Sequence, residues 1–281
     1  MNEQGDTKEL YFDDGVSLEK IAESGQCFRW KKLEAGTYLV PANGWCAILV
    51  QKTENTVEIT CNPRTIETWR NYLACYDDYS DTIREAEEAI TQTGAADEYL
   101  REAVKAAAGL RILCQDLWET IVSFVISQNN NIPRIKSTIE LLCERFGTEK
   151  EFCGHRYYTF PTPEQLCNED LTTCGLGYRA EYLESIVKNT LAGTIDLRTL
   201  RKSDTGEARN ILKSIRGIGD KVADCILLYG LNRLDAFPID TWMKKIIAEH
   251  YDGKFPIEHY SEQAGLIQQY LFYYERKEHG K

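Results

Sequence analysis

One lysine stands where the local electrostatics disfavour it. Lys221 follows the glycine pair in "GIGDKVADC" and falls in the first turn of a predicted helix, near the positive end of the helix dipole. That position, together with burial against a substrate, would lower the pKa of the amine, and an unprotonated amine is a nucleophile. The alternative interpretation is a charge that neutralises a phosphate, which requires no pKa shift.

A carboxylate follows nineteen residues later, in "AFPIDTWMKKII". Asp240 precedes a predicted helix, so the simplest role for it is an N-cap, which keeps the carboxylate ionised. Beside the amine, the same group could stabilise positive charge on a sugar and orient the nucleophile. Cys225 lies one helical turn after Lys221 on the same face, where it could be an apolar wall or a weak polar neighbour. Together, Lys221 and Asp240 indicate covalent chemistry in addition to binding.

The elements that must position these groups are two helices joined by a Gly-x-Gly turn, over about 209–231. Gly217 and Gly219 lack side chains, so backbone amides of the turn can approach an anion at the start of the second helix. With Lys221 they are candidate contacts to a DNA phosphate. An ordinary tight αα-hairpin is the alternative.

The rest of the sequence predicts an α+β fold. Short β-branched and aromatic runs at 37–41, 45–52 and 56–61 predict an antiparallel sheet, and from Pro63 onward the apolar spacing is helical. The predicted helices are 65–76, 97–113, 116–127, 133–147, 179–193, 207–215, 221–231, 241–251 and 261–277. We expect an N-terminal sheet domain over 1–108 and a helical domain over 109–281.

Composition and charge narrow the class of protein. The net charge of −11 over 281 residues argues against a uniformly basic nucleic-acid binder, but 211–247 carries six basic against four acidic side chains, so a local basic face is possible. No apolar run is long enough for a membrane, and no export signal is visible, so we predict an intracellular protein whose ten cysteines are reduced. We also expect a monomer. Scattered histidines and the lack of a CxxC pair argue against a metal or cluster site.

Taken in order, several motifs resemble the 8-oxoguanine DNA glycosylases of the eukaryotic type, in the helix-hairpin-helix superfamily of base-excision glycosylases. The resemblance covers most of the chain and is carried by "SGQCFRW" (24–30), "SFVISQNNNIPRI" (123–135), "GLGYRAEYL" (175–183), "GIGDKVADCILL", "FPID" and "QQYLF" (268–272). It implies that Lys221 attacks C1′ of a flipped nucleotide, forms a Schiff base and nicks the strand by β-elimination, without an organic cofactor. Asp240 matches the essential carboxylate of the family.

The resemblance also implies a partner, double-stranded DNA containing 8-oxoguanine, and two sets of binding residues. The first set would hold the lesion base: Gly25, Cys225, Gln268 and Phe272. The Gly25 carbonyl would accept the N7–H that 8-oxoguanine has and guanine lacks. The second set would contact the opposite cytosine: Asn129, Arg134, Tyr178 and Arg179. In a prokaryote the protein would lie with the nucleoid in the cytoplasm, and in a eukaryote in the nucleus.

Each of these residues also has a purely structural interpretation. Phe272 could be a core residue, Gln268 could face solvent, Gly25 could serve a turn, and Arg179 could be a surface charge. The asparagines near Asn129 could form a capped loop.

Some positions depart from the pattern of the family. Arg216 stands where many such hairpins have proline, and Trp242 and Glu275 stand where some relatives carry a histidine–aspartate pair near the DNA. The resemblance further implies an alkali or calcium ion at the hairpin, held by backbone carbonyls of Lys213, Ile215 and Ile218.

Two other functions stay open from the sequence. A glycosylase of the same superfamily for another lesion, such as an alkylated purine, would keep the hairpin and Asp240 but would usually lack the lysine or the Gln268/Phe272 pair. A non-catalytic DNA-binding protein would use the hairpin and form no covalent product.

Overall fold

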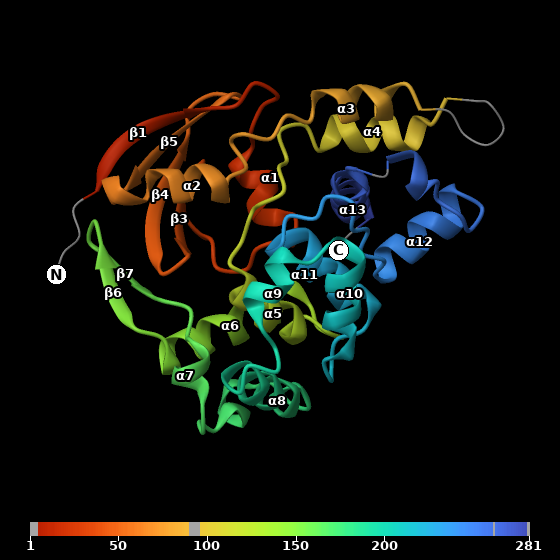
Figure 1. The fold of residues 1–281 in the computed structure, drawn as a ribbon. Helices are drawn as coiled ribbons and strands as arrows, with labels where there is room; N and C mark the ends of the chain where they lie inside the picture. The colour runs from red at the N-terminus through yellow and green to blue at the C-terminus, as the bar shows by residue number, and fades with distance from the viewer. Residues whose placement is uncertain (1–4, 90–95, 261, 280–281) are drawn as a thin grey trace.

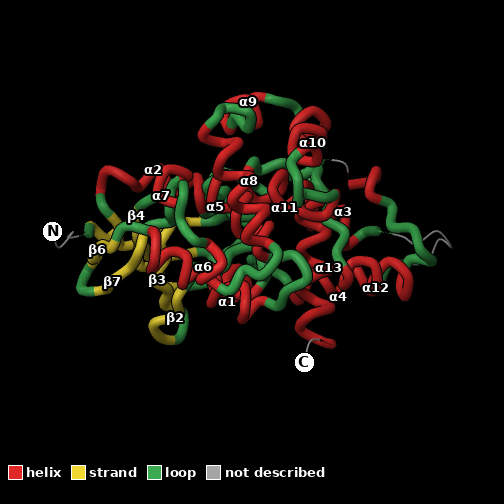
Figure 2. The backbone as a smooth tube through the Cα atoms, turned by 90° about the horizontal axis from the view of Figure 1, so that it is seen from below, coloured by secondary structure: helices red, strands yellow, loops and turns green. Residues whose placement is uncertain are grey.

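The computed structural model describes residues 5–89, 96–260 and 262–279, which form a five-stranded antiparallel sheet beside a larger body of helices (Figure 1). The sheet strands are β1 (Asp6–Tyr11), β2 (Lys31–Glu34), β3 (Thr37–Ala42), β4 (Trp45–Gln51) and β5 (Thr56–Cys61). Their spatial order is β1-β5-β4-β3-β2. The predicted α+β architecture is confirmed, and Figure 2 shows the strands gathered at one end of the molecule.

All the predicted helices are present, although their ends differ. The helices are α1 (Leu18–Glu23), α2 (Ile66–Tyr72), α3 (Ser80–Glu87), α4 (Glu98–Ala106), α5 (Leu117–Ile126), α6 (Ile132–Phe146), α7 (Pro163–Leu166), α8 (Arg179–Leu191), α9 (Leu197–Lys202), α10 (Thr205–Ser214), α11 (Asp220–Gly230), α12 (Thr241–His250) and α13 (Ala264–His279). The sequence did not predict α1, α3, α7 or α9. Ser261, the first residue of the last predicted helix, lies outside the described residues.

Strand β3, which lies between β4 and the edge strand β2, is buried along its whole length because both of its faces are covered. Tyr38 and Val40 pack in the core that the sheet shares with α1 and α2. Leu39 points to the other face and packs against Phe152 and Tyr157. Those two side chains come from a hairpin far along the chain, formed by β6 (Glu149–Phe152) and β7 (His155–Tyr158).

The β6–β7 hairpin corrects the prediction that everything after Pro63 is helical. Its turn residues Cys153 and Gly154 both have positive φ, +47° and +79°, which is the backbone twist that a two-residue hairpin turn requires. The strands are four residues long and rich in charge, so alternation gave little indication of them. Burial of Phe152 and Tyr157 against the sheet stabilises the hairpin.

The helix predicted over 97–113 is too long, because α4 ends at Ala106. Gly109 has φ +79°, and a Cβ there would lie 2.9 Å from the backbone of Val16, so this residue must be glycine. Beyond it, the buried Arg111 pairs with Asp14 and donates to the carbonyl of Ala74 at 2.8 Å. These long-range bonds hold 110–116 as a segment without regular secondary structure.

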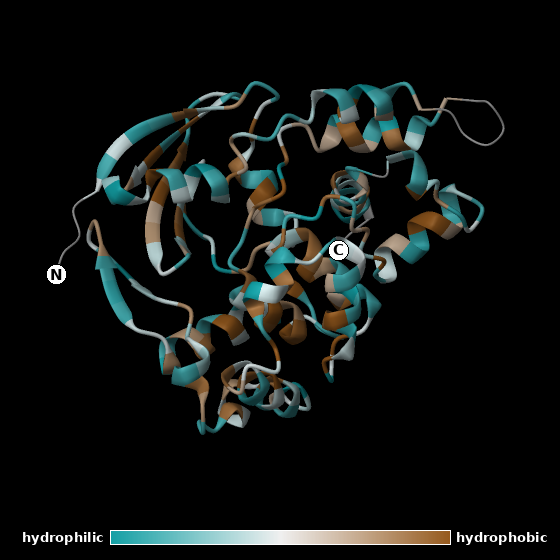
Figure 3. Cartoon of the chain, in the orientation of Figure 1, coloured by the Kyte–Doolittle hydropathy of each residue, from teal (hydrophilic) through white to brown (hydrophobic). Residues whose placement is uncertain are grey.

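The main core lies among the helices and includes apolar residues of α4 and α5. Figure 3 shows the hydrophobic residues of these helices in brown. Ala86 of α3 and Leu100 of α4 belong to this cluster, so both helices pack on the helical body although they precede the boundary predicted at 108/109. That boundary stays a prediction. Within the described ranges no helix combines the length and apolar character needed to cross a bilayer.

Candidate active site

The predicted Gly-x-Gly turn joins α10 to α11 as expected. Gly217 has φ +93°, and a Cβ there would lie 2.6 Å from the ring of Tyr182, so the close packing of α8 also requires glycine. The amide of Gln128, at the end of α5, donates to the Gly217 carbonyl at 2.9 Å. Gly219 is the N-cap of α11, is exposed, and supplies no capping side chain. The first amides of α11 are therefore accessible to an anion.

Charges around the turn are largely paired within it. Asp220, the first residue of α11, forms an ion pair with Lys213 at 2.5 Å, and that bond holds the pKa of Asp220 below its usual range. Arg216 lies 3.4 Å from Glu181 of α8. The carboxylate of Asp220 thus faces a lysine, which reduces its repulsion of a phosphate.

The backbone carbonyls predicted to hold an ion at the hairpin, those of Lys213, Ile215 and Ile218, lie at or next to this turn. The amide of Ile218 donates to the carbonyl of Ile215 at 3.0 Å, and a carbonyl keeps a second lone pair when it accepts one bond. The backbone therefore does not oppose such an ion, which stays a prediction.

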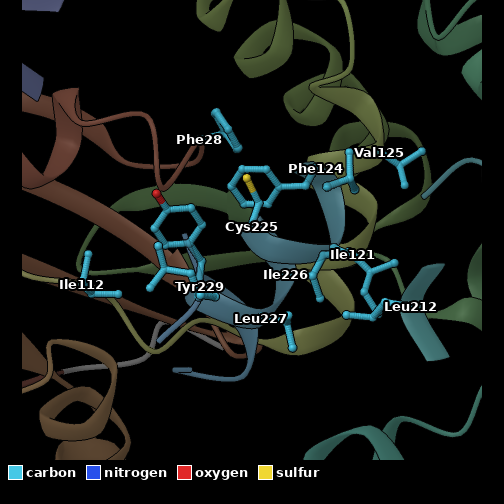
Figure 4. Packing of buried hydrophobic residues seen from close by; sticks show 14 of the residues in the cluster. Phe28, Ile112, Ile121, Phe124, Val125, Leu212, Cys225, Ile226, Leu227 and Tyr229 are labelled. Carbon is cyan, nitrogen blue, oxygen red and sulfur yellow. The ribbon is translucent and has the colours of Figure 1, made fainter. Parts of the chain in front are cut away.

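Lys221 is half-buried in the first turn of α11, with Nζ 5.4 Å from the centroid of the Phe124 ring. A cation at that distance from an aromatic face is stabilised by the ring. Phe124, from α5, stacks on Tyr229 and contacts the edge of Phe28, and Figure 4 shows this aromatic group around Cys225. The amine therefore stands beside a buried aromatic cluster, and not in open solvent.

The pKa of the Cys225 thiol is affected by both predicted catalytic groups. Burial raises the pKa of this thiol to about 11; the charge of Lys221, with its hydrogen bond, lowers it, and the charge of Asp240 raises it. Both charges act on this buried thiol, so Lys221 of α11 and Asp240 at the start of α12 lie in its neighbourhood. Such a placement is compatible with the predicted chemistry.

Asp240 is the N-cap of α12, as predicted. Its Oδ1 accepts a hydrogen bond from the amide of Met243 at 2.9 Å, and the residue is half-buried. The cap uses Oδ1 of the carboxylate, and Oδ2 can still face a neighbouring cation. Capping and an electrostatic role in catalysis are compatible.

Of the two lesion-base residues on α13, Phe272 packs against the main core, as its structural interpretation supposed, whereas Gln268 departs from its own. Gln268 is 3% exposed, so the suggestion that it faces solvent is wrong, and its Oε1 is buried with no hydrogen-bond partner among the described residues. Phe272 is half-buried one turn later. A buried amide oxygen without a partner is costly, unless a ligand supplies the donor.

Gly25 lies against the same helix. Its φ is +79°, and a Cβ would lie 3.4 Å from Cε1 of Phe272 and 3.3 Å from Cδ1 of Ile132. The structure thus places Gly25 next to Phe272. On α11, Tyr229 lies one turn after Cys225 and donates through its hydroxyl to Gln269, the neighbour of Gln268. This bond holds the helices of Cys225 and Gln268 together.

Three of the four predicted opposite-base residues contact one another. Asn129, with φ +46°, donates to the hydroxyl of Tyr178 at 3.2 Å, and the ring of Tyr178, 49% exposed, lies 4.6 Å below the guanidinium of Arg179. Arg179 is buried and donates to the carbonyls of Gln128, Asn129 and Leu176, so its interpretation as a surface charge is wrong. Arg134 is exposed at the start of α6. Contact of these side chains with a cytosine stays a prediction.

Glu275 has intramolecular partners at the position where some relatives carry an aspartate. It is 1% exposed and accepts from Lys245 Nζ and from the Tyr99 hydroxyl, each at 2.7 Å. The ammonium of Lys245 also lies 5.8 Å from the ring of Trp242. Glu275 therefore links α13 to α12 and α4.

Sequence reasoning missed three residues of this site: Phe124, Gln269 and Arg276. Phe124 was read only as part of an apolar helix, and Gln269 as part of the motif "QQYLF". The single clue to Gln269 was a second amide in a helix segment otherwise apolar, which indicates a buried hydrogen-bonding role.

Comparisons with known proteins agree with this geometry. Residues 10–121 match the N-terminal domain of 8-oxoguanine DNA glycosylase, and residues 122–263 match the HhH-GPD superfamily of base excision DNA repair proteins. The fold and the site thus define a base-excision repair protein of the helix-hairpin-helix class. The chain belongs to the 8-oxoguanine DNA glycosylase family within that superfamily.

The similarity to solved structures extends over the whole chain. A structure of MBOgg1 in complex with a low affinity DNA ligand is 37% identical, with a TM-score of 0.90, and covers 100% of this chain and 98% of its own. The Clostridium acetobutylicum 8-oxoguanine glycosylase/lyase, in complex with double-stranded DNA containing cytosine opposite 8-oxoguanine, is 32% identical, with a TM-score of 0.87 and 99% coverage of each chain.

Curated relatives are matched over less of their length. A probable N-glycosylase/DNA lyase of Methanothermobacter thermautotrophicus is 32% identical over 64% of this chain and 68% of the relative. The N-glycosylase/DNA lyase of Saccharomyces cerevisiae is 36% identical over 51% of this chain, which spans only 42% of the yeast protein.

Proposed function

We propose that this protein is a DNA glycosylase with AP lyase activity, and that it removes 8-oxoguanine from duplex DNA. The observation that carries the proposal is the half-buried amine of Lys221, 5.4 Å from the ring centroid of Phe124 and one helical turn before the buried Cys225. The unpartnered amide oxygen of Gln268 and the ring of Phe272 lie on a helix bonded to the helix of Cys225. The names of the similar proteins support the same activity.

Binding would begin at the hairpin. The accessible amides of the α11 N-terminus would hold a phosphate of the damaged strand, and the damaged nucleotide would rotate out of the duplex at a cost of about a few kcal/mol. Asn129 and Tyr178 would enter the space that the base leaves, and the exposed Arg134 would donate to N3 and O2 of the opposite cytosine, since arginine can only donate. Arg179, whose guanidinium holds the carbonyls of Gln128, Asn129 and Leu176, would contact the cytosine only through its remaining N–H. Cytosine is therefore the expected partner base.

Within the pocket, a purine would stack on Phe272, and the oxygen of Gln268 would accept from its Watson–Crick edge. The unprotonated amine of Lys221 would attack C1′, so that the Nζ–C1′ bond forms while the bond from C1′ to the base breaks and its electron pair leaves with the base. Asp240 would stabilise the positive charge that develops on the sugar. Opening of the sugar ring gives the Schiff base; loss of a C2′ proton then expels the 3′ phosphate and nicks the strand.

The proposal predicts a covalent product and a preference for one partner base. With borohydride present, a duplex with 8-oxoguanine opposite cytosine should give a trapped complex, and single-turnover excision opposite cytosine should exceed that opposite adenine by about tenfold or more, a difference of about 1.4 kcal/mol in barrier. The measurement compares trapping and excision with the lesion opposite each of the four bases. Absence of trapping on every duplex would favour a DNA-binding protein without catalysis, and equal rates opposite all four bases would remove the opposite-base assignment.

Base recognition by Gln268 can be tested separately from the chemistry. Gln268→Ala should slow excision of 8-oxoguanine about a hundredfold, because the donors on the purine edge lose their acceptor in a buried site. Affinity for a duplex with an abasic product should change by less than about twofold, since that ligand has no base. If both quantities fell by the same factor, Gln268 would act in general DNA binding instead.

A further inference from the structure

Three side-chain donors, one from the segment before α5 and two from α13, hold the backbone carbonyls on either side of Gly25. The bonds are Arg276 Nη1 to Glu23 O (3.1 Å), Gln269 Nε2 to Ser24 O (2.9 Å) and Gln115 Nε2 to Gln26 O (2.7 Å). The Gly25 carbonyl, between them, accepts no hydrogen bond within the described part of the chain. Of four consecutive carbonyls, it is the one left available for a ligand.

The donors are themselves fixed. Gln269 is fully buried and accepts from the hydroxyl of Tyr229 on α11. The guanidinium of Arg276 lies over the ring of Phe272, 5.4 Å from its centroid, and 3.6 Å from the position of a Cβ on Gly25. Both residues are on α13, the helix that also carries Gln268 and Phe272. One helix thus holds the Gly25 turn and the predicted base-binding side chains in a single arrangement.

We infer that Gln115, Gln269 and Arg276 form a carbonyl clamp, which aims the Gly25 carbonyl and so determines discrimination between a purine that carries N7–H and guanine. The inference rests on the proposed function and adds positioning residues to it. None of the three side chains needs to touch the base, because each acts on the backbone next to Gly25.

The physical reason is the small difference between the two purines at N7. An N7–H can donate to a fixed carbonyl, whereas guanine presents a lone pair there and leaves the acceptor unpaired and repelled. A site that recognises N7–H through one hydrogen bond rejects guanine strongly only if the accepting carbonyl cannot rotate away from N7. Gly25 has φ +79°, and a glycine can leave that conformation easily because it has no side chain to restrict its backbone. The hydrogen bonds of the clamp fix the peptide groups on either side of Gly25 and so restrict rotation of its carbonyl.

The test measures affinity in a Lys221→Gln background, in which no base is released. Dissociation constants are determined for three duplexes, which carry 8-oxoguanine, guanine or a tetrahydrofuran abasic analogue opposite cytosine. We expect Arg276→Leu to reduce the preference for 8-oxoguanine over guanine at least about fivefold, while affinity for the abasic duplex changes by less than about twofold. Arg276→Lys, which keeps one donor for Glu23 O, should recover part of the preference.

Controls separate the possible results. Gln269→Leu removes the bond to the Ser24 carbonyl, but Gln269 is fully buried, so this substitution could impair folding. Arg276 is only half-buried, so its variants test the inference even if Gln269→Leu does not fold. Arg84→Leu, on the exposed surface of α3, is the matched control and should leave every constant unchanged. An unchanged preference in folded Arg276→Leu overturns the clamp. Lack of any preference in the Lys221→Gln parent would instead contradict the proposed function.

Discussion

Replacing Lys221 with glutamine is expected to abolish the borohydride-trapped complex and to slow base release and strand nicking by at least about a thousandfold. Glutamine has a similar length, but its amide nitrogen is not nucleophilic and cannot form a Schiff base. The side chain would still fit beside Phe124, so the fold should persist. Single-turnover excision and trapping on an 8-oxoguanine duplex measure the effect, and equilibrium binding should stay within about tenfold of the unmodified protein.

Lys213→Gln is the matched control for this change. Lys213 lies at the end of α10, close to the same turn, and its ion pair with Asp220 is largely exposed. Its loss removes one positive charge from the hairpin without removing the amine beside Phe124, so DNA affinity should fall slightly and trapping should persist. Trapping that survived in Lys221→Gln would show that another amine is the nucleophile.

The second large effect is expected at Asp240, where charge and capping can be separated. Asparagine caps a helix about as well as aspartate, so Asp240→Asn should keep the bond to the Met243 amide and change the free energy of unfolding by less than about 0.5 kcal/mol. Excision should nevertheless slow by about two orders of magnitude or more, since the negative charge facing the developing sugar cation is lost. Chemical denaturation and single-turnover kinetics measure the two quantities on one preparation.

Two further variants define the interpretation. Asp204→Asn makes the same substitution at the N-cap of α10, where Asp204 accepts from the Glu207 amide at 2.8 Å, and should affect neither stability nor rate. Asp240→Ala should lower the free energy of unfolding by about 1 kcal/mol, because the cap is removed as well. A normal excision rate in Asp240→Asn would reduce Asp240 to a capping residue.

Much of the local structure could be predicted because it depends on neighbouring residues. The spacing of apolar side chains predicted α5, α6 and α11 within a few positions, and Asp240 has the polar side chain that an N-cap needs. The Gly-x-Gly turn was predictable for the same reason, since the positive φ of Gly217 favours glycine. The nucleophile and the carboxylate were chosen from these local positions together with the resemblance.

Errors arose where distant contacts decide the conformation. The β6–β7 hairpin is stabilised by Leu39, more than a hundred residues earlier, and α4 ends because Gly109 meets Val16 and Arg111 is bound by Asp14. Nothing in the helical periodicity around 149–158 or 97–113 contains that information. A tertiary contact outweighed the local propensity in both places.

The sequence by itself determined which side chains could perform the chemistry, and where along the chain the turns and caps lie, since these follow from covalent neighbours. Only the tertiary structure decided that Lys221 and Asp240 both act on Cys225, that Gln268 is buried with an unpartnered oxygen, and that α13 holds the carbonyls beside Gly25. The reason is that burial and electrostatic proximity join residues from separate helices. Those distances are fixed by packing of the whole core and not by position in the sequence.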